Sequence, residues 1–380
     1  MKTIGFDLRP LQSGFKAHKE RGIGVYTKNL FDRFSMAPAD LSVVGFHDPY
    51  YGRCAPGSLE FKMGSLSRIL RPRLKEYFNQ HLLMRKAIDR SLKSANVERI
   101  FFPTHLDAPA GLQTPYAVTA HDMIQSALMN RYYNTFKHKI HIAKQVEVLK
   151  GAGLIIAVSH FTKKDVVKHA GVDPGRVVVV HNGVAPDFKP GARGATGRFS
   201  LPEKFILNVG GIDKRKNMEL LFDSFKSLLD IDPDFHLVIT GAIEADPQYQ
   251  KFLNALDGRS LASRAIAPGY VTKEDLVMLY NRATVFVYPS LYEGFGLPIL
   301  EAMACGAPVI STNRSSIPEV AGDAALLLDP DEPEAFAEAV TTIARSVEER
   351  EKMSRAGIKR AAQFSWDICA KKTWEALSAM

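Results

Sequence analysis

Apolar runs of strand length alternate with longer amphipathic segments along most of the chain. The runs are typical of buried strands, and the segments between them have the three-to-four-residue period of helices. This order predicts parallel α/β units. We expect strands at residues 3–8, 41–46, 99–102, 116–120, 154–158, 177–180, 204–209, 236–239, 285–288, 308–311 and 325–328. We expect helices at residues 23–36, 72–94, 133–150, 161–169, 217–229, 247–256, 273–281, 297–305, 334–345 and 347–364.

One stretch shows neither period. Residues 189–202, KPGARGATGRFSLP, are rich in Gly, Pro, Ala and Ser, which is typical of a linker. The linker predicts an N-terminal α/β domain at 1–190 and a C-terminal α/β domain at 200–364. Because ligands of open α/β sheets bind beyond the carboxyl ends of the strands, we expect the chemistry in the loops that follow strands.

The composition is that of a globular protein. Hydrophobic residues make up 46% and charged residues 24% of the 380 residues, which excludes a mainly disordered, collagen-like or coiled-coil chain. The three cysteines are far apart, so a reducing cytoplasm is the simplest compartment. The N-terminal apolar stretch is too short for a signal peptide, and no run approaches the ~18 apolar residues of a membrane span.

The net charge of +8 is concentrated in one segment. Residues 61–100 hold ten Lys or Arg against three Asp or Glu, and their apolar residues recur mostly three or four apart. A helix with a basic face is therefore expected. One interpretation is a core helix with a solvated face. Another is peripheral docking on an anionic membrane, which attracts such charge. Nucleic-acid binding is disfavoured because no binding motif accompanies the charge.

The most informative segment is Y-P-S-L-Y-E-G-F-G-L-P-I-L-E, residues 288–301. A strand ends there, a loop follows, and a helix begins near Leu297. Gly294 and Gly296 leave the backbone bare just before the helix. Exposed N–H groups and the helix dipole favour an anion at such a point.

Two carboxylates accompany these glycines. Glu293 precedes them in the loop, and Glu301 lies eight positions later on the expected helix. The first is placed to meet a group bound at the loop, and the second to accept two hydroxyls of a sugar or ribose. The alternative is a tight strand–helix turn with surface acids.

A second loop, V-G-G-I-D-K-R-K-N at residues 209–217, also follows a strand and precedes a helix. Gly210 and Gly211 allow the backbone to approach a ligand, while Arg215 and Lys216 supply fixed positive charge. A diphosphate leaving group needs such charge as its bond breaks. The alternative is a helix-start loop with solvated charges.

The segment E-G-F-G-L-P-I-L-E-A-M-A-C-G-A-P-V-I resembles the signature of retaining glycosyltransferases of family 4, group 1. Glu293 and Glu301 match the family's pair of glutamates. The resemblance covers most of the chain and is strongest from residue 205 to 329. It implies the GT-B fold, in which two Rossmann-like parallel-sheet domains face a central cleft. The N-terminal domain would bind the acceptor and the C-terminal domain the donor, with helix 365–380 packing back on the first domain.

The resemblance also implies roles for particular residues. Family members often carry an Arg where Gly211 stands, and Arg215 is expected to substitute for it. The implied catalytic residues are Glu293, His121, Arg215 and Lys216. The implied donor-binding residues are Gly22, Gly24, Gly210, Gly211, Val271, Gly294, Phe295, Gly296, Leu297 and Glu301.

The residues of the first half carry less information by themselves. Gly22 and Gly24 form a lone G-x-G without the third glycine of a dinucleotide fingerprint, so a tight turn is an equal alternative. A histidine directly after a strand is more often structural than catalytic. The resemblance places His121 beside the transferred sugar, where Asp122 would contact it or orient its ring.

The function implied is that of a metal-independent, retaining hexosyltransferase. It would transfer a sugar from a nucleoside diphosphate to a glycan or lipid-linked glycan in polysaccharide or lipopolysaccharide assembly. Resemblance to mannosyl- and rhamnosyltransferases favours GDP-mannose, with a UDP-sugar as the alternative. No cofactor is expected, because the Asp-Pro-Asp triplets at 232–234 and 329–331 favour turns and caps over metal binding. Three other functions remain open: a sugar-nucleotide epimerase, a nicotinamide dehydrogenase and a non-catalytic sugar-nucleotide binding protein.

Overall fold

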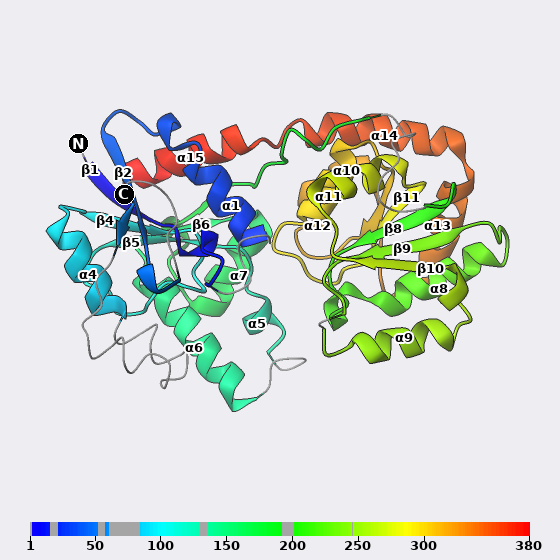
Figure 1. Ribbon diagram of the computed structural model, residues 1–380, viewed down its shortest axis with the longest axis horizontal. Helices are drawn as coiled ribbons and strands as arrows, with labels where there is room; N and C mark the ends of the chain where they lie inside the picture. The colour runs from blue at the N-terminus through cyan, green and yellow to red at the C-terminus, as the bar shows by residue number, and fades with distance from the viewer. Residues whose placement is uncertain are drawn as a thin grey trace. The chain divides into compact units, whose positions relative to one another are not determined.

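The computed structural model describes residues 2–15, 22–51, 58–60, 84–129, 135–191, 201–244 and 246–380. The chain divides into two compact units, each with its own sheet (Figure 1). Unit 1 comprises Met1–Gly183 and Trp366–Met380, and unit 2 comprises Val184–Ser365. The terminal segment therefore returns to the first unit after the chain has completed the second.

The expected domain boundary is wrong by a short segment, because residues 184–190 belong to unit 2. Val184 pairs with Ser365 and donates its N–H to the carbonyl of Phe364. Phe188 is buried against the ring of Tyr280, which also lies in unit 2. These contacts tie the segment to the second unit before the expected linker begins. Most of that linker, 192–200, lies outside the described residues.

Unit 1 is built on a parallel sheet whose described strands have the order β3-β2-β1-β4-β5-β6-β7. The strands are β1 (Lys2–Asp7), β2 (Leu41–His47), β3 (Leu59–Glu60), β4 (Arg99–Phe102), β5 (Tyr116–Ala120), β6 (Leu154–Ala157) and β7 (Val177–Val179). The described α-helices are α1 (Gly22–Phe31), α4 (Met84–Ser94), α5 (Ile124–Ala127), α6 (Phe136–Gly151), α7 (His160–Ala170) and α15 (Trp366–Ala379).

Unit 2 repeats the architecture with described strands in the order β10-β9-β8-β11-β12-β13, again all parallel. They are β8 (Phe205–Val209), β9 (His236–Thr240), β10 (Ala265–Gly269), β11 (Val285–Tyr288), β12 (Val309–Thr312) and β13 (Leu326–Leu328). The α-helices are α8 (Met218–Leu229), α9 (Tyr249–Asp257), α10 (Lys273–Arg282), α11 (Leu297–Ala304), α12 (Ile317–Ala321), α13 (Pro333–Arg345) and α14 (Val347–Ala361).

The strands read as apolar runs because both faces of each sheet are covered. All four residues of β6 and all four of β11 are buried, as expected of parallel strands between helical layers. In unit 2, α8 packs with α13 and α11 packs with α14. The predicted class, two parallel-sheet α/β domains, is therefore confirmed.

The sequence prediction missed four short elements. The strands β3 and β10 escaped it, as did the helices α5 and α12. β10 is an edge strand with the sequence AIAPG, mostly half-buried, so it lacks an apolar run and contains a proline that edges tolerate. The other three are too short to show a period.

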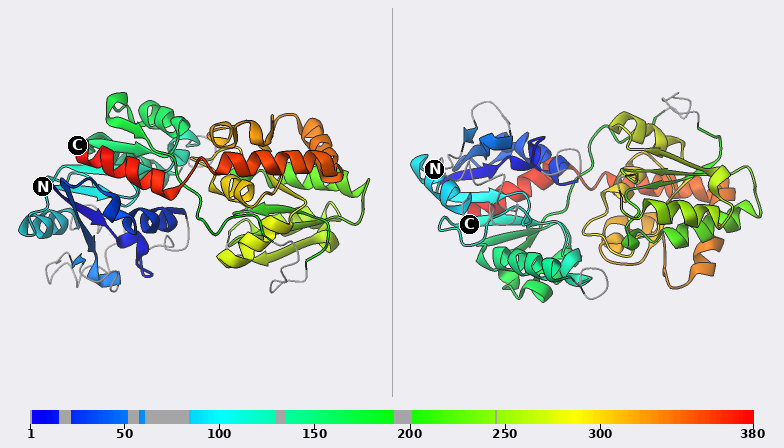
Figure 2. Two further views of the ribbon diagram at one scale, coloured as in Figure 1. Left: turned by 90° about the horizontal axis from the view of Figure 1, so that it is seen from above. Right: turned by 60° about the horizontal axis from the view of Figure 1, so that its bottom comes forward.

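The terminal helix α15 completes the core of unit 1 (Figures 1 and 2). Trp366 and Trp374 are fully buried, the first against Tyr26 of α1 and the second against Phe6 of β1. Large aromatic rings of this kind bury more apolar area than any other side chain. The return of the chain is therefore part of the packing of unit 1.

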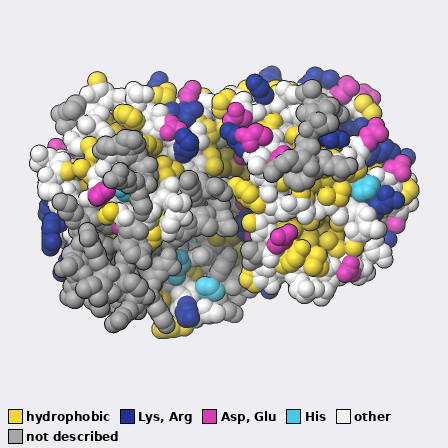
Figure 3. All heavy atoms as spheres, in the orientation of Figure 1, with side chains coloured by type: hydrophobic (Ala, Val, Ile, Leu, Met, Phe, Trp, Pro, Cys, Tyr) yellow, Lys and Arg dark blue, Asp and Glu magenta, His cyan; other side chains and the backbone are white. Residues whose placement is uncertain are grey.

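The basic segment is described only from α4 onwards, and residues 61–83 lie outside the described residues. Ile88 and Leu92 of α4 are buried in the core of unit 1, while Lys86, Arg90 and Lys93 are exposed. This part is a core helix with a solvated basic face. Over the visible face of unit 2, basic and acidic side chains are interspersed (Figure 3). Among the described helices, none combines the length and apolar character needed to cross a bilayer.

Candidate active site

The loops that follow β8 and β11 meet at the carboxyl edge of the second sheet, because these two strands are neighbours. The first loop carries the short 3₁₀ turn Lys214–Lys216, and the second leads into α11. The Leu291 N–H donates to the carbonyl of Arg215 at 2.7 Å, which joins the two loops. Two segments far apart in the sequence therefore form one surface.

Four side chains converge on a single oxygen of Glu293. Its Oε1 atom accepts hydrogen bonds from Arg215 Nη1 and Lys216 Nζ, both at 2.7 Å. It also accepts from the Tyr288 hydroxyl at 2.9 Å and the Ser290 hydroxyl at 2.6 Å. The side chains of Glu293 and Lys216 are only 13% and 9% exposed. The alternative interpretation, a loop with solvated charges, therefore does not describe Lys216 and Glu293, which are largely withdrawn from water.

The electrostatics of this cluster follow from its charges. Burial alone would raise the pKa of Glu293, but the cations Lys216 and Arg215 outweigh it and hold this pKa at about 2. Burial lowers the pKa of Lys216 below its ordinary value, against the opposing effect of Glu293. Glu293 is thus an ionised carboxylate that holds two cations side by side.

Two serines after β12 fix the loop that carries Glu293. The Glu293 N–H donates to the Ser315 hydroxyl at 2.9 Å. Ser316 donates to the carbonyls of Glu293 at 2.9 Å and Phe295 at 3.0 Å. Both serines were missed as site residues, since their only signal in the sequence is a position after a strand. Their hydroxyls set the backbone of Glu293 rather than its carboxylate.

The expected glycine loop leads into α11 as predicted. Gly296 is the residue before the helix and has φ of +103°, a conformation that side chains with a Cβ rarely adopt. Leu297 is the first helical residue, followed by Pro298. The Phe295 side chain is buried against Phe364, so only its backbone faces the loop. The positive end of α11 is therefore directed to the site.

Glu301 lies on α11, apart from the Glu293 cluster. Its Oε2 accepts a hydrogen bond from the Tyr280 hydroxyl of α10 at 3.3 Å. Burial raises the pKa of Glu301 to about 8, and the bond from Tyr280 offsets this only in part. The two glutamates of the motif therefore have opposite electrostatic environments within one unit.

Glycine backbones line the edge beyond β8, β9 and β10. The Gly210 N–H donates to Thr240, and the Gly241 N–H donates to Gly269. A Cβ on Gly241 would lie 2.0 Å from the carbonyl oxygen of Gly210, so only glycine fits there. Sequence reasoning singled out Gly210 and missed Gly241. Val271 lies two residues after Gly269, and its side chain is buried.

The remaining candidates lie in unit 1. His121 follows β5, and its Nε2 is 2.8 Å from the carbonyl oxygen of Pro103. Its ring packs edge-on against Tyr26, with ring centroids 4.9 Å apart. Gly22 and Gly24 lie in the first turn of α1, the former exposed and the latter buried. The structure places these residues at the carboxyl edge of the first sheet.

Both Asp-Pro-Asp triplets are engaged by basic side chains. Asp232 accepts from Lys204 at 3.0 Å. Asp329 and Asp331 both accept from Arg314 at 2.7 Å. The first Asp of each triplet also accepts from the backbone N–H two residues later, at 3.3 Å from Asp234 and 3.0 Å from Asp331, which agrees with the interpretation of both triplets as turns.

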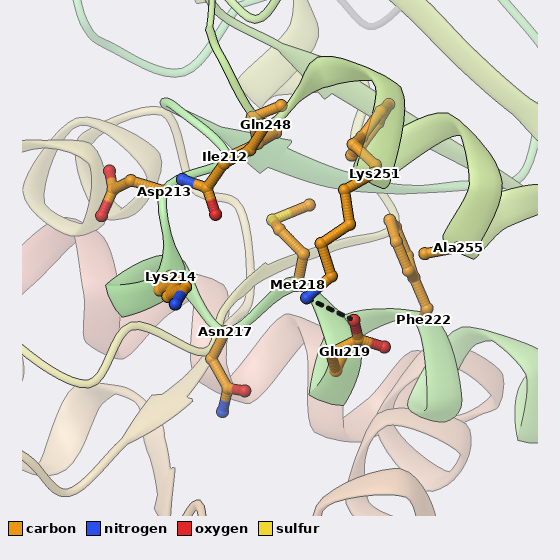
Figure 4. Close-up of a pocket in the computed structure, with 11 residues that line it drawn as sticks. Ile212, Asp213, Lys214, Asn217, Met218, Glu219, Phe222, Gln248, Lys251 and Ala255 are labelled. Atoms are coloured by element: carbon orange, nitrogen blue, oxygen red, sulfur yellow. Dashed lines mark ion pairs between the residues drawn. The ribbon is translucent and has the colours of Figure 1, made fainter. Parts of the chain in front are cut away.

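A pocket lies between the β8–α8 loop and α9 (Figure 4). Ile212, Met218 and Phe222 form part of its apolar lining. The Lys251 amine points toward the Glu219 carboxylate, 4.0 Å away. Asp213 lines this pocket and also pairs with Arg215, so the same loop contributes to the pocket and to the Glu293 cluster.

Two family models match the chain. Glycosyltransferase Family 4 matches residues 21–188, and Glycosyl transferases group 1 matches residues 196–360. Together they span most of both units. The chain belongs to the group 1 glycosyltransferases.

Two curated relatives come from Escherichia coli. The chain is 34% identical to O-antigen chain mannosyltransferase B over 60% of this chain and 61% of the relative. It is 27% identical to the serotype-specific mannosyltransferase WbdA over 65% of this chain and 31% of that relative. The match thus spans less than two thirds of the length of either glycosyltransferase.

Solved structures share the fold. Sucrose-phosphate synthase from Thermosynechococcus elongatus superposes with a TM-score of 0.78 at 19% identity, covering 100% of this chain and 99% of that one. Anabaena HepE in complex with UDP and glucose gives a TM-score of 0.70 at 17% identity, covering 100% of both chains. The expected GT-B fold of this glycosyltransferase is therefore confirmed.

The structure brings together only part of the predicted site of this glycosyltransferase. Glu293, Arg215 and Lys216 touch one another. Sequence reasoning missed Tyr288 and Ser290, which complete the cluster. Tyr288 ends a buried strand, so its sequence signal was that of a core residue.

Replacing Glu293 by Gln is expected to lower the free energy of unfolding by about 3 kcal/mol at pH 7, because the largely buried Lys216 loses its counter-charge and Arg215 retains only Asp213. The double variant Glu293→Gln, Lys216→Met should recover part of this loss. Urea unfolding measures both. Since the Glu293 pKa is depressed from 4.5, its contribution is present above that pH and is lost as pH falls toward 2. If Glu293→Gln is as stable as wild type, Glu293 does not act as a stabilising counter-charge for Lys216 and Arg215.

Glu301 predicts the opposite pH dependence. Its pKa is raised from 4.5 to about 8, so the folded protein retains a proton that the unfolded chain releases, and stability falls as pH rises across this window. Glu301→Gln should remove that component. Melting temperatures of wild type and Glu301→Gln from about pH 5 to 8.5 test this. The control is Glu338→Gln, since Glu338 is an exposed residue of α13. A constant difference between Glu301→Gln and wild type would refute the raised pKa.

Proposed function

We propose that this chain is a retaining, metal-independent hexosyltransferase that uses a nucleoside-diphosphate sugar. The observation that carries the proposal is the Glu293 cluster, where Arg215 and Lys216 are held together beside the N-terminus of α11. Cations and a helix N-terminus are the groups that bind and stabilise a departing diphosphate. Family membership supports the same chemistry.

The mechanism we infer is a front-face substitution. The bond between the sugar carbon and the diphosphate oxygen breaks while the acceptor hydroxyl attacks the same face. The leaving phosphate oxygen takes the proton of that hydroxyl. Arg215 and Lys216 would stabilise the negative charge that develops on the diphosphate. Because Glu293 already fixes both cations, little reorganisation is required during the reaction.

The proposal assigns roles to the other predicted residues. Glu293 would contact the transferred sugar through Oε2, which has no hydrogen bond among those described for this residue. Glu301 would accept the ribose hydroxyls, and His121 of unit 1 would lie beside the sugar. The glycine backbones at 210 and 211 and at 294–297 would line the phosphates, with Gly22 and Gly24 contacting them from unit 1.

For the donor and acceptor we propose GDP-mannose and a glycan or lipid-linked glycan of polysaccharide or lipopolysaccharide assembly. The names of the two Escherichia coli relatives support mannose and O-antigen-type chains. A UDP-sugar is the alternative, since the related fold of HepE was solved with UDP and glucose. We propose that the protein acts at the cytoplasmic face of a membrane, where the basic residues of 61–100 would be attracted to anionic lipid.

Incubation with radiolabelled GDP-mannose or UDP-glucose and a short soluble mannose oligosaccharide tests the proposal. A lengthened product with the donor's anomeric configuration, assigned by NMR, is the expected result. Epimerised or hydrolysed donor without an acceptor product would indicate the epimerase alternative. Tight nucleotide binding without turnover would indicate a non-catalytic binding protein.

Replacing Lys216 by Met is expected to reduce kcat by about 100–1000-fold, the usual loss for one preorganised charge-stabilising group. The Met side chain keeps the apolar stem packed. Rates measured beside melting temperatures separate catalysis from folding. An unchanged kcat in the folded variant would remove Lys216 from the mechanism.

Activity should also be unchanged by an excess of EDTA, because the cationic side chains and the helix end are available for the diphosphate. The assay compares initial rates before and after chelation, and again after Mg²⁺ is added back. A loss that Mg²⁺ reverses would show that a metal ion takes part.

A further inference from the structure

The proposed donor must extend from the Glu293 cluster toward one end of the second sheet. On the β12 side, Ser315 and Ser316 hold the Glu293 loop, and Arg314 is paired with Asp329 and Asp331. On the other side the edge is lined by glycine backbones. Side chains thus line the β12 side of the cluster, whereas backbone lines the side toward β9 and β10.

Glu301 indicates the same direction. It lies on α11 and receives the hydrogen bond of Tyr280 from α10, the helix that begins after the β10 loop. Helix α10 packs against α11, and the loop between β10 and α10 precedes it. We infer that a nucleotide whose ribose reaches Glu301 extends its base toward this loop. The residues of this loop are Gly269, Tyr270, Val271 and Thr272.

Two features at this loop suit a flat heterocycle. Tyr270 is an aromatic residue that is 59% exposed, and exposed aromatic rings are the side chains on which bases stack. The Glu244 carboxylate, in the loop after β9, lies 3.7 Å from the point where a side chain on Gly269 would begin. Glu244 is exposed, and among the described residues none is paired with it.

We propose that Glu244 reads the base of the donor nucleotide and selects guanine. This inference rests on the proposed function and concerns the same site. Guanine presents two adjacent donors, N1–H and the 2-amino group, to which a carboxylate binds through both oxygens. Uracil presents N3–H between two carbonyl oxygens, so the second carboxylate oxygen would face an acceptor. Adenine presents an acceptor at N1.

The test is calorimetric titration of the full chain with GDP, UDP and IDP, which lacks the 2-amino group. Wild type should bind GDP about 10–100-fold more tightly than UDP, the discrimination of one bidentate contact. In Glu244→Gln the amide donates to a uracil carbonyl but opposes a guanine donor. The GDP-to-UDP ratio should therefore fall by a similar factor, and the preference of GDP over IDP should disappear.

Glu338→Gln is the matched control, because it removes the same charge from an exposed site on α13 and should leave every ratio unchanged. An unaltered ratio in Glu244→Gln, or a wild-type preference for UDP, would overturn the guanine assignment and leave the glycosyltransferase proposal standing. If wild type binds none of the three nucleotides, the proposed function fails, and this inference fails with it.

Discussion

The site in the second unit depends on one carboxylate that is shared by two cations. Arg215 and Lys216 adjoin in the sequence, and their like charges would repel in a partly buried loop. Glu293 removes that penalty by accepting from both at one oxygen. Tyr288 and Ser290 satisfy the same oxygen, so the cluster has a single arrangement. The two cations are therefore held in place by the protein's own counter-charge.

This arrangement explains why the motif contains two glutamates in different environments. Glu293 is surrounded by positive charge and remains ionised, whereas burial favours the protonated form of Glu301. The first holds two cations. In the proposed function it would also meet the transferred sugar, and the second would bind the ribose hydroxyls. The same residue type therefore serves two purposes, and the difference lies in what packs around it.

The sheet positions these groups by a simple geometric rule. Parallel strands place all their following loops at one edge, so residues from β8, β11 and β12 meet although β9 and β10 intervene in the sequence. Backbone contacts also form part of this edge. Gly241 lies so close to the carbonyl oxygen of Gly210 that no side chain fits at position 241. The hydrogen bonds of Ser315 and Ser316 then fix the loop that carries Glu293.

The sequence by itself determined the architecture and the region of the site. Apolar runs of strand length mark strands covered on both faces, and the glutamates and glycines of 293–301 mark a loop before a helix. Tertiary structure decided the rest. Arg215 and Glu293 are 78 positions apart, and only the pairing of β8 with β11 brings them to 2.7 Å. Such long-range contacts also decide three other features. They bury Lys216, they bring the Tyr288 hydroxyl to Glu293, and they assign residues 184–190 to unit 2. Local sequence patterns do not encode these contacts. The spacing of apolar residues shows which face of a strand or helix is buried, but it does not show which residues pack against that face.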